Sequence, residues 1–426
     1  MTRLASWRSF PFLFLVIFLD ACGGGSVGPP PPPIPVTRDI AFVSSRALDG
    51  SDAANTNSAQ NLWAVNADGT GAVPLTTLTA NGIFSSDPAW SPDGTKIAFA
   101  SNRAEDGSDG LNSVSPSWVW VVDVDGSHEV PLTTFANDGS FHWSVTSPSW
   151  SPDGLKLSAV NICCLDLLHN VAVMNADGSN FTVLTSFVAP LPDTGTGSGR
   201  WSPDGLKLIF DYPGGFPANV LAPPQQIWVM SVDGSDQTAL TDLKASSVRS
   251  FNPNWSPDAS EVAFSSSRAL DGSDAANPNG TINIWVMNAD GTGVRPLTTL
   301  TAAGADCGFA SWSPDGTKLA FESARSLDGS DAANANLIVN IWVINADGTG
   351  AIPLTNLTAV GASSHDAVWS PDGSKLAFDS LRAIDGRDLA NAASNIWIMN
   401  PDGSGATPLT KNTTKGGDSV QPKWRP

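Results

Sequence analysis

Hydrophobic residues along this chain come in short runs, each separated from the next by a tight polar turn. After residue 38, runs such as 97–99 and 284–287 are bounded by turn sequences of the Ser-Pro-Asp-Gly and Asn-Ala-Asp-Gly kinds. Short apolar runs between turn residues are typical of β-strands. No helical periodicity extends over 18 residues after residue 40. The pattern therefore predicts an all-β fold built from many short strands.

The strands belong to a repeat whose copies lie 51 to 60 residues apart. A Trp-Ser-Pro-Asp-Gly segment, or a close variant, begins at Trp90, Trp150, Trp201, Trp255, Trp312 and Trp369. Each copy continues with a run like Ile-Ala-Phe, then one like Asn-Ile-Trp-Val, and closes near Pro-Leu-Thr. A type I turn prefers proline at its second position and glycine at its fourth, so the first motif joins strand A to strand B. Asn-Ala-Asp-Gly likewise predicts a hairpin between strands C and D.

Two features of the repeat indicate the blade of a β-propeller. Strand C, for example residues 284–287, is apolar on both faces and must be covered on both sides. Strand D often contains a proline, a residue that sheets tolerate at their edges. These prolines are Pro74, Pro131, Pro296, Pro353 and Pro408. A four-stranded sheet that packs between two neighbours and ends in an edge strand is a propeller blade.

The two ends of the repeat region predict a closed ring of seven blades. The run at residues 40–42 has no Trp-Ser-Pro-Asp-Gly before it, and residues 421–424 form an A strand with no B strand after it. Trp424 lies 55 residues after Trp369, within the range of the repeat. We therefore expect the last strand to complete the first blade. The prediction is a seven-bladed β-propeller over residues 39–426, with four antiparallel strands in each blade.

The Trp-Ser-Pro-Asp-Gly, Ile-Ala-Phe, Asp-Gly and Leu-Thr series resembles the TolB-type propeller repeat, and it covers residues 39–426. The resemblance implies the fold but not the function. Repeats of this type occur in envelope scaffolds, in substrate-gating domains of peptidases and in some lyases. The chain differs from TolB in having no α/β domain before the propeller and seven predicted blades where TolB has six.

The N-terminal residues have the features of a bacterial lipoprotein leader. Residues 1–21 combine Arg3 and Arg8 with the apolar stretch 10–19, which is too short to cross a bilayer. Leu-Asp-Ala-Cys at 19–22 resembles a lipobox, with Cys22 as the acylated residue and Asp20 as an unusual member. An ordinary secretory signal with a coincidental cysteine is the alternative. Residues 22–38 form a Gly-rich and then Pro-rich tether, so we expect anchoring in the bacterial envelope, in the periplasm or at the outer membrane or cell surface.

The charge of the chain follows largely from its turns. The formal net charge is −19, but only four of the 41 acidic residues are glutamate. Aspartate is favoured in turns because its side chain bonds to nearby backbone groups. The sequence also has no stripe of lysine and arginine that would displace counterions from phosphates. Nucleic acid is therefore excluded as an expected partner.

Antiparallel connectivity places the A–B and C–D turns at one end of every blade and the B–C and D–A connections at the other. We call these ends the short-turn face and the long-loop face. Binding residues usually collect on longer loops, which predicts a binding site on the long-loop face. The D–A connections supply the candidates for this site, which are Asp87, His142, Asp306, His365, Asp366 and Asp418.

The B–C loops of blades 1, 2, 5, 6 and 7 carry copies or variants of Leu-Asp-Gly-Ser-Asp-Ala-Ala-Asn. Four of these loops supply the candidate acidic residues Asp49, Asp52, Asp271, Asp274, Asp328, Asp331, Asp385 and Asp388. Their oxygens suit Ca²⁺, but the run lacks the EF-hand order and its final glutamate. A self-capped surface loop is the favoured interpretation. Because the ring closes, these five blades form a continuous acidic arc, and blades 3 and 4 interrupt it with the apolar segments 161–165 and 212–217.

Catalytic patterns are sparse. Seven-bladed lyases of similar repeat type use histidine clusters to hold a metal, whereas here only His142 and His365 are placed to converge, too few for a usual metal site. Gly-Gly-Ser-Val-Gly at 24–28 lies in the tether, without the strand and helix of a nucleophile elbow. The cysteines at 163, 164 and 307 suit either a vicinal disulfide or buried thiols.

The expected function is a non-enzymatic, monomeric binding or scaffold module of the envelope, without cofactor or metal, that contacts a protein or a glycan. The membrane is expected as a partner only through the lipid anchor. The alternative is a metal-dependent, lyase-like carbohydrate-active enzyme that uses the long-loop face.

Overall fold

The hydrophobic runs fold into seven four-stranded antiparallel sheets, as shown by a computed structural model of the chain. The compact unit formed by these sheets spans Thr37–Pro426. The described residues are 38–111, 117–134, 143–163, 168–185, 197, 199–212, 224–245 and 247–426. The predicted leader, Cys22 and all of the predicted tether except Arg38 lie outside them. Among the described residues, no helix has the length and apolar character that a membrane span requires.

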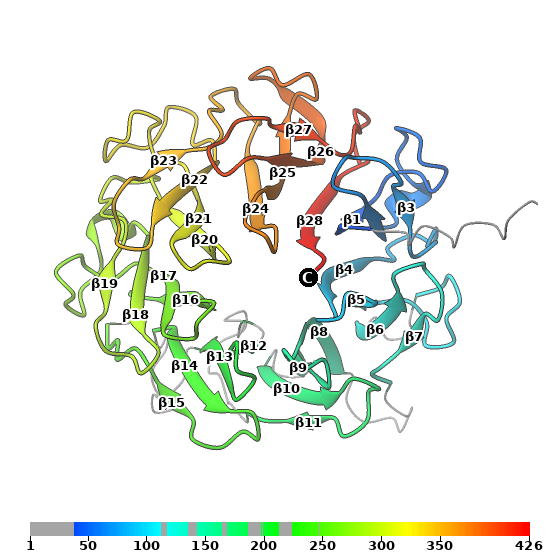
Figure 1. The fold of residues 1–426 in the computed structure, drawn as a ribbon, viewed down its shortest axis with the longest axis horizontal. Coiled ribbons are helices and arrows are strands. Elements are labelled where there is room, and N and C mark those ends of the chain that lie inside the picture. Colours follow the sequence, from blue (N-terminus) through cyan, green and yellow to red (C-terminus); the bar gives the residue numbers. More distant parts are fainter. Residues whose placement is uncertain are drawn as a thin grey trace, which may run out of the picture. The chain divides into compact units, whose positions relative to one another are not determined.

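The sheets stand around a common axis with their first strands innermost, as the blades of a propeller (Figure 1). In order from the inner to the outer strand, blade 1 contains β28 (Ser419–Trp424), β1 (Ile40–Ser44), β2 (Asn61–Val65) and β3 (Val73–Pro74). Blade 2 contains β4 (Ser85–Trp90), β5 (Lys96–Ser101), β6 (Trp118–Asp123) and β7 (Val130–Pro131). Blade 3 contains β8 (Trp143–Trp150), β9 (Lys156–Cys163), β10 (Leu168–Asn175) and β11 (Thr182–Val183).

The other four blades repeat this order. Blade 4 contains β12 (Arg200–Trp201), β13 (Lys207–Tyr212), β14 (Gln226–Ser231) and β15 (Thr238–Ala239). Blade 5 contains β16 (Ser250–Trp255), β17 (Glu261–Ser266), β18 (Asn283–Asn288) and β19 (Arg295–Pro296). Blade 6 contains β20 (Cys307–Trp312), β21 (Lys318–Ser323), β22 (Asn340–Asn345) and β23 (Ile352–Pro353). Blade 7 contains β24 (Ser364–Trp369), β25 (Leu376–Arg382), β26 (Ala390–Met399) and β27 (Thr407–Pro408), and the short 3₁₀ turns are η1 (Thr56–Ser58) and η2 (Pro278–Gly280).

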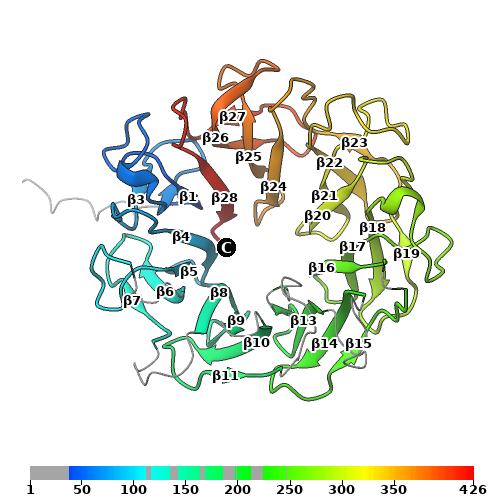
Figure 2. The same ribbon diagram turned by 180° about the vertical axis from the view of Figure 1, so that it is seen from behind.

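The last strand closes the ring by joining the first blade. β28 pairs antiparallel with β1, with Trp424 opposite Ile40 and Ser419 opposite Ser44. The hydroxyl oxygens of Ser44 and Ser419 lie 2.9 Å apart in a hydrogen bond. Figure 2 shows β28 beside β1 from the opposite side. The all-β class, the seven blades of four antiparallel strands and the closure by the C-terminal strand are confirmed.

The repeated tryptophan of each inner strand ties its blade to the blade before it. Its indole N–H donates to a main-chain carbonyl of the preceding inner strand, at 3.0 to 3.3 Å. Trp90 of blade 2, for example, donates to Lys423 of blade 1. The donors in chain order are Trp90, Trp150, Trp201, Trp255, Trp312, Trp369 and Trp424. The hydrogen bonds thus run around the whole ring, which explains why every copy of the repeat begins with tryptophan.

The core lies between the blades, as the two apolar faces of strand C predict. Trp285 and Trp342, both in strand C, are fully buried, as are Phe264 and Phe321 opposite them in strand B. The D strands have two residues each and end their sheets. Five of them carry the predicted edge proline, whereas β11 and β15 have none.

Candidate functional site

The inner strands carry a repeated irregularity that shapes the central rim. In β4, β8, β16, β20, β24 and β28 the register with the paired strand shifts between the fourth residue before the tryptophan and the residue just before it. The residue three before the tryptophan has a φ between 51° and 58°, which is typical of a bulge and is tolerated best by Asn and Asp among residues with a side chain. These residues are Asp87, Ser147, Asn252, Phe309, Asp366 and Gln421.

A bulge leaves its N–H without a partner in the sheet, and the preceding blade supplies an acceptor. Asp366 donates its N–H to Glu322 Oε1 at 2.6 Å. Asn252 donates to Asp211 Oδ1 at 3.3 Å, and the N–H of Asp87 donates to Gln421 Oε1 at 3.1 Å. Polar side chains of one blade therefore reach the inner strand of the next blade beside the rim.

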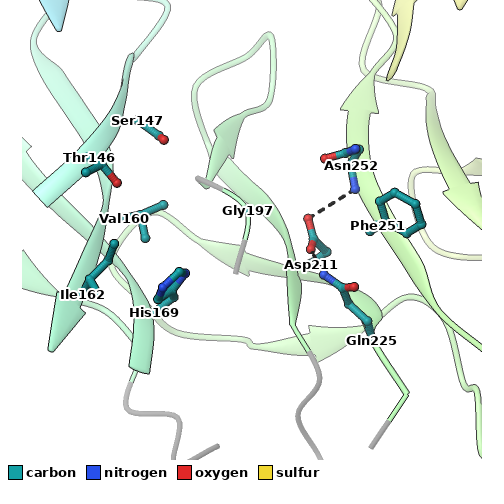
Figure 3. Close-up of a pocket in the computed structure, with 10 residues that line it drawn as sticks. All are labelled: Thr146, Ser147, Val160, Ile162, His169, Gly197, Asp211, Gln225, Phe251 and Asn252. Atoms are coloured by element: carbon teal, nitrogen blue, oxygen red, sulfur yellow. Dashed lines mark hydrogen bonds between the residues drawn. The ribbon is translucent and has the colours of Figure 1, made fainter. Parts of the chain in front are cut away.

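A cavity of about 340 Å³ lies at the long-loop end of blades 3, 4 and 5. Figure 3 shows side chains from β8, β9 and β10 on one side and from β13, β16 and the residue before β14 on the other, with the chain at residue 197 between them. The lining residues are Thr146, Ser147, Val160, Ile162, His169, Gly197, Asp211, Gln225, Phe251 and Asn252. The cavity thus combines hydroxyl, carboxamide, imidazole and carboxyl groups with one aromatic ring.

Asp211 is the most perturbed group in this cavity. Its side chain is almost fully buried, and this burial raises its pKa to about 6. Hydrogen bonds from the Asn252 N–H and the Gln225 carboxamide and the positive charge of Arg200 act in the opposite direction and lower the pKa. The Gln225 Nε2 donates to Asp211 Oδ2. A Cβ at Gly197 would lie 2.5 Å from Asp211 Oδ1, so the connection passes this carboxyl only because residue 197 is glycine.

A second polar cluster lies between blades 6 and 7. His365 Nδ1 is 3.0 Å from Glu322 Oε2, and the Glu322 side chain is 9% exposed while that of His365 is 42% exposed. The hydrogen bond to Glu322 raises the pKa of His365. Asp379 accepts the Ser394 hydroxyl at 3.1 Å, and its burial, followed by the charge of Asp366, raises its pKa to about 8. In the described part of the chain, no group of three or more His, Cys, Asp or Glu side chains is placed to hold a metal ion.

Of the described residues expected in the D–A connections, three lie within inner strands and two lie just before inner strands. Asp87, His365 and Asp366 lie within the inner strands β4 and β24, where Asp87 and Asp366 form the bulges. Asp306 and Asp418 lie just before inner strands and bond to the preceding blade. Asp306 Oδ1 accepts the N–H of Ile282, and Asp418 Oδ1 accepts that of Ser394, both at 2.8 Å. His142 lies outside the described residues, so its predicted convergence with His365 stays a prediction.

In the acidic loops, the first aspartate caps its own turn. Asp49 Oδ1 accepts the N–H of Ser51 at 2.8 Å, and hydrogen bonds from Ser51 lower the pKa of Asp49. The same contact occurs at Asp106, Asp271, Asp328 and Asp385. These aspartates thus perform the turn chemistry that their abundance suggested.

The second aspartate of each loop forms what we call the inter-blade latch. Asp331 of blade 6 accepts the N–H groups of Thr301 and Ala302, at 2.7 and 3.1 Å, in the connection that leaves blade 5. The five latch residues are Asp52, Asp109, Asp274, Asp331 and Asp388. Within the described residues, the latches join blades 7 to 1, 1 to 2, 4 to 5, 5 to 6 and 6 to 7. The predicted acidic arc is therefore a set of structural contacts between blades.

An arginine at the base of each of these loops completes the arrangement. Arg325 donates to the carbonyl of Gly329 and lies 4.9 Å from the ring centre of Trp342 in strand C, which is a cation–π distance. The same pair of contacts recurs at Arg46, Arg103, Arg268 and Arg382. The loop is thus fixed both to itself and to the blade beneath it.

The cavity lies where the sequence predicted a gap in the arc. Of the two segments that define the gap, Asn161, Ile162 and Tyr212 have described side chains, and Ile162 lines the cavity.

Asp211, Glu322 and Asp379 were not anticipated as functional residues. They share one position of the repeat, in strand B, ten residues after the tryptophan of the inner strand. The other blades carry Val43, Ala100, Val160 and Ser265 there. An alignment of the seven copies at this position would have marked them.

Comparison with known proteins shows the fold. No family model matches the chain. An uncharacterized protein of Agrobacterium fabrum is 26% identical over 273 residues, which is 54% of this chain and 83% of that protein. Crystal structures of TolB from Acinetobacter baumannii (15% identity, TM-score 0.48, 91% of this chain and 67% of that chain) and of oligogalacturonate lyase from Vibrio parahaemolyticus (14%, 0.57, 84% and 91%) are also similar.

A puromycin-hydrolyzing peptidase of Mycobacterium tuberculosis is similar at 11% identity with a TM-score of 0.57. The match covers 89% of this chain, which spans about half of the peptidase (53%). The similar structures thus include enzymes of two classes. At these identities the likeness establishes the β-propeller fold, and the function has to be argued from the site.

Proposed function

We propose that this protein is a non-enzymatic binding module of the bacterial cell envelope, which holds a short segment of an envelope protein or glycan in the cavity of blades 3, 4 and 5. The observation that carries the proposal is the position of the cavity. It lies at the long-loop end of blades 3, 4 and 5, and blades 3 and 4 are the two blades in which no described B–C residue supplies a latch aspartate.

The lining of the cavity suits a polar ligand. Thr146, Ser147, Gln225 and Asn252 offer hydroxyl and carboxamide groups that donate and accept hydrogen bonds. Phe251 adds an aromatic ring to the same wall (Figure 3). A volume of about 340 Å³ is at the lower end of ordinary ligand pockets and fits one or two sugar rings or a few peptide residues. Sites that bind such ligands combine a few polar groups with apolar contact area in this way.

The envelope location rests on the sequence of the first 38 residues. A leader followed by Cys22 and a Gly-rich and Pro-rich tether would hold the propeller off a membrane surface. Mass spectrometry of the mature protein tests this part separately. We expect an N-terminal Cys22 with added acyl mass, and an unmodified N-terminus at any other residue would refute lipid anchoring.

The cavity itself is tested by filling it. Thr146 lies four residues before Trp150, and Ser86 holds the same place before Trp90 in blade 2, which has no part in the cavity. We expect Thr146→Trp to abolish capture of a ligand from envelope extracts or a glycan array, with Ser86→Trp retaining it. A ligand bound equally by both variants would refute the site.

A metal-dependent carbohydrate-active enzyme is the second candidate. It is favoured by the pairing of half-exposed His365 with buried Glu322, because a carboxylate that orients a histidine is a common feature of catalytic and metal sites. The test is turnover of an acidic oligosaccharide with divalent metal, by the wild-type protein and the His142→Ala/His365→Ala variant. Turnover that this variant loses would overturn the binding proposal.

A further inference from the structure

Two leucines on the short-turn face are exposed in adjacent blades. Leu155 and Leu206 lie in the A–B turns of blades 3 and 4, within two copies of Asp-Gly-Leu-Lys-Leu. Their residues are 67% and 65% exposed. A large apolar side chain left in water at the tip of a tight turn contributes nothing to the core, so its presence calls for another explanation.

The equivalent turns of the other blades show what the turn itself favours. Thr95, Ser260, Thr317 and Ser374 occupy the position of the leucines, and each donates its hydroxyl to the turn aspartate at 2.8 to 2.9 Å. Leu155 and Leu206 keep only the main-chain hydrogen bond to Asp153 and Asp204, at 3.0 Å. The two leucines therefore replace a hydrogen bond that four equivalent turns make, and local stability does not account for them.

The glycine of the blade 4 turn lies beside the proline of the blade 3 turn. A Cβ placed on Gly205 would lie 3.6 Å from Cδ of Pro152, so these two turns of blades 4 and 3 are neighbours on the short-turn face. Pro152, like the two leucines, is exposed. We call Pro152, Leu155 and Leu206 the leucine patch.

The surroundings of the leucine patch are acidic. The turns of blades 3 and 4 on this face contain Asp153, Asp177, Asp204 and Asp233, against the two cations Lys156 and Lys207. Hydrogen bonds from neighbouring serines lower the pKa of each of the four aspartates, so all of them are charged at neutral pH. An anionic lipid surface or a second copy of a chain with a net charge of −19 would meet like charge here.

We propose that the leucine patch is a docking site for a partner protein segment that presents apolar side chains flanked by lysine or arginine. The apolar side chains would cover Leu155 and Leu206, and the basic residues would face the turn aspartates, which gives both affinity and orientation. The patch lies at the opposite end of the blades from the cavity. This inference therefore stands apart from the proposed ligand site.

The probe is a fluorescein-labelled peptide of alternating leucine and lysine, with binding measured by fluorescence anisotropy. The test variant is Leu155→Thr/Leu206→Ser, which installs residues that equivalent turns already carry and leaves the charge unchanged. The control is Leu337→Ser, because Leu337 is 58% exposed in the B–C connection of blade 6 on the long-loop face. We expect the double variant to bind the peptide at least about tenfold more weakly, and the control to bind like the wild-type protein.

Three outcomes would overturn the proposal. The first is peptide binding that is absent, or unchanged in the double variant. The second is leucine-dependent sedimentation with phosphatidylcholine or phosphatidylglycerol vesicles, which would make the patch a membrane contact. The third is a leucine-dependent dimer in analytical ultracentrifugation, which would make it a self-association surface.

Discussion

Blades 3 and 4 differ from the five-blade arc of blades 1, 2, 5, 6 and 7 in three separate places. The arc has an inter-blade latch on the long-loop face, an edge proline in strand D and, in four of its blades, a hydroxyl residue in the A–B turn. In blades 3 and 4, strands β11 and β15 have no proline, and the A–B turns carry Leu155 and Leu206. No described B–C residue of these two blades supplies a latch aspartate, although the connection after blade 4 donates to Asp274 of blade 5. The leucine patch lies in these two blades, and the cavity lies in them and in blade 5.

The interior does not share this difference. The chain of indole hydrogen bonds passes through blades 3 and 4 as through the others, from Trp150 to Ala89 and from Trp201 to Ser149. The hydrogen bonds that link the inner strands are therefore present in all seven blades, although the inner strand of blade 4 has only two residues. A repeat scaffold allows this because each blade contacts only its neighbours, so surface turns vary without loss of the ring.

The contribution of the ring tryptophans to stability is compared by removing one tryptophan from each region. We expect Trp312→Ala in the arc and Trp201→Ala in blade 4 to cost similar amounts, about 3–5 kcal/mol each, because both side chains are buried and both bridge two blades. Urea unfolding measures the free energies. A cost in blade 4 that is far below that in the arc would show that the two regions differ inside as well as outside.

The buried carboxyl of the cavity predicts a pH dependence that belongs to blades 3 to 5. Because the folded pKa of Asp211 is about 6 and its ordinary value is 3.8, its contribution is fully present below pH 4 and is lost as the pH rises through 6. At pH 7.5 the loss is about 2–3 kcal/mol. In unfolding titrations between pH 4 and 7.5, Asp211→Asn is expected to reduce the slope by this amount and to leave the part that comes from Asp379, whose pKa is raised to about 8. An unchanged slope in the variant would assign the titration to another group.

The latch predicts a smaller and more local effect in the arc. Asp331→Ala leaves the N–H groups of Thr301 and Ala302 to water, and we expect a loss of about 1 kcal/mol. Hydrogen exchange by mass spectrometry should show faster exchange in the connection of residues 297–306. Ser179→Ala, in a turn of blade 3 without a latch, serves as the control, and equal changes in both variants would contradict a role for the latch between blades.

The smallest expected effect is a gain in stability. Leu155→Thr restores the hydroxyl-to-aspartate hydrogen bond that Thr95 and Thr317 make, so we expect an increase of about 0.5 kcal/mol in the unfolding free energy. Thermal unfolding compares this variant with Thr317→Leu, which should lose a similar amount. A destabilised Leu155→Thr would show that the leucine supports the fold, which would remove one argument for the docking site.

Much of the fold was predictable because its signals are local. Pro at the second and Gly at the fourth turn position define the A–B turn within four residues, and the prolines of strand D mark an edge wherever they occur. The closure was predictable because Trp424 keeps the spacing of the repeat. The candidate residues Asp87, His365 and Asp366 lie in the inner strands β4 and β24, where connections were expected.

The sequence by itself determined the strands, the count of seven blades and the split first blade, since these depend on turn chemistry and on a period that is visible along the chain. The tertiary structure alone decided which polar groups meet. The cavity, the pairing of Glu322 with His365 and the latches all join residues of different blades. Their hydrogen-bond partners lie 29 to 44 residues apart in the chain, or 361 residues apart for the latch of Asp52 that spans the ring closure. The partner of each group is set by how neighbouring blades pack against each other, and no short stretch of sequence contains that register.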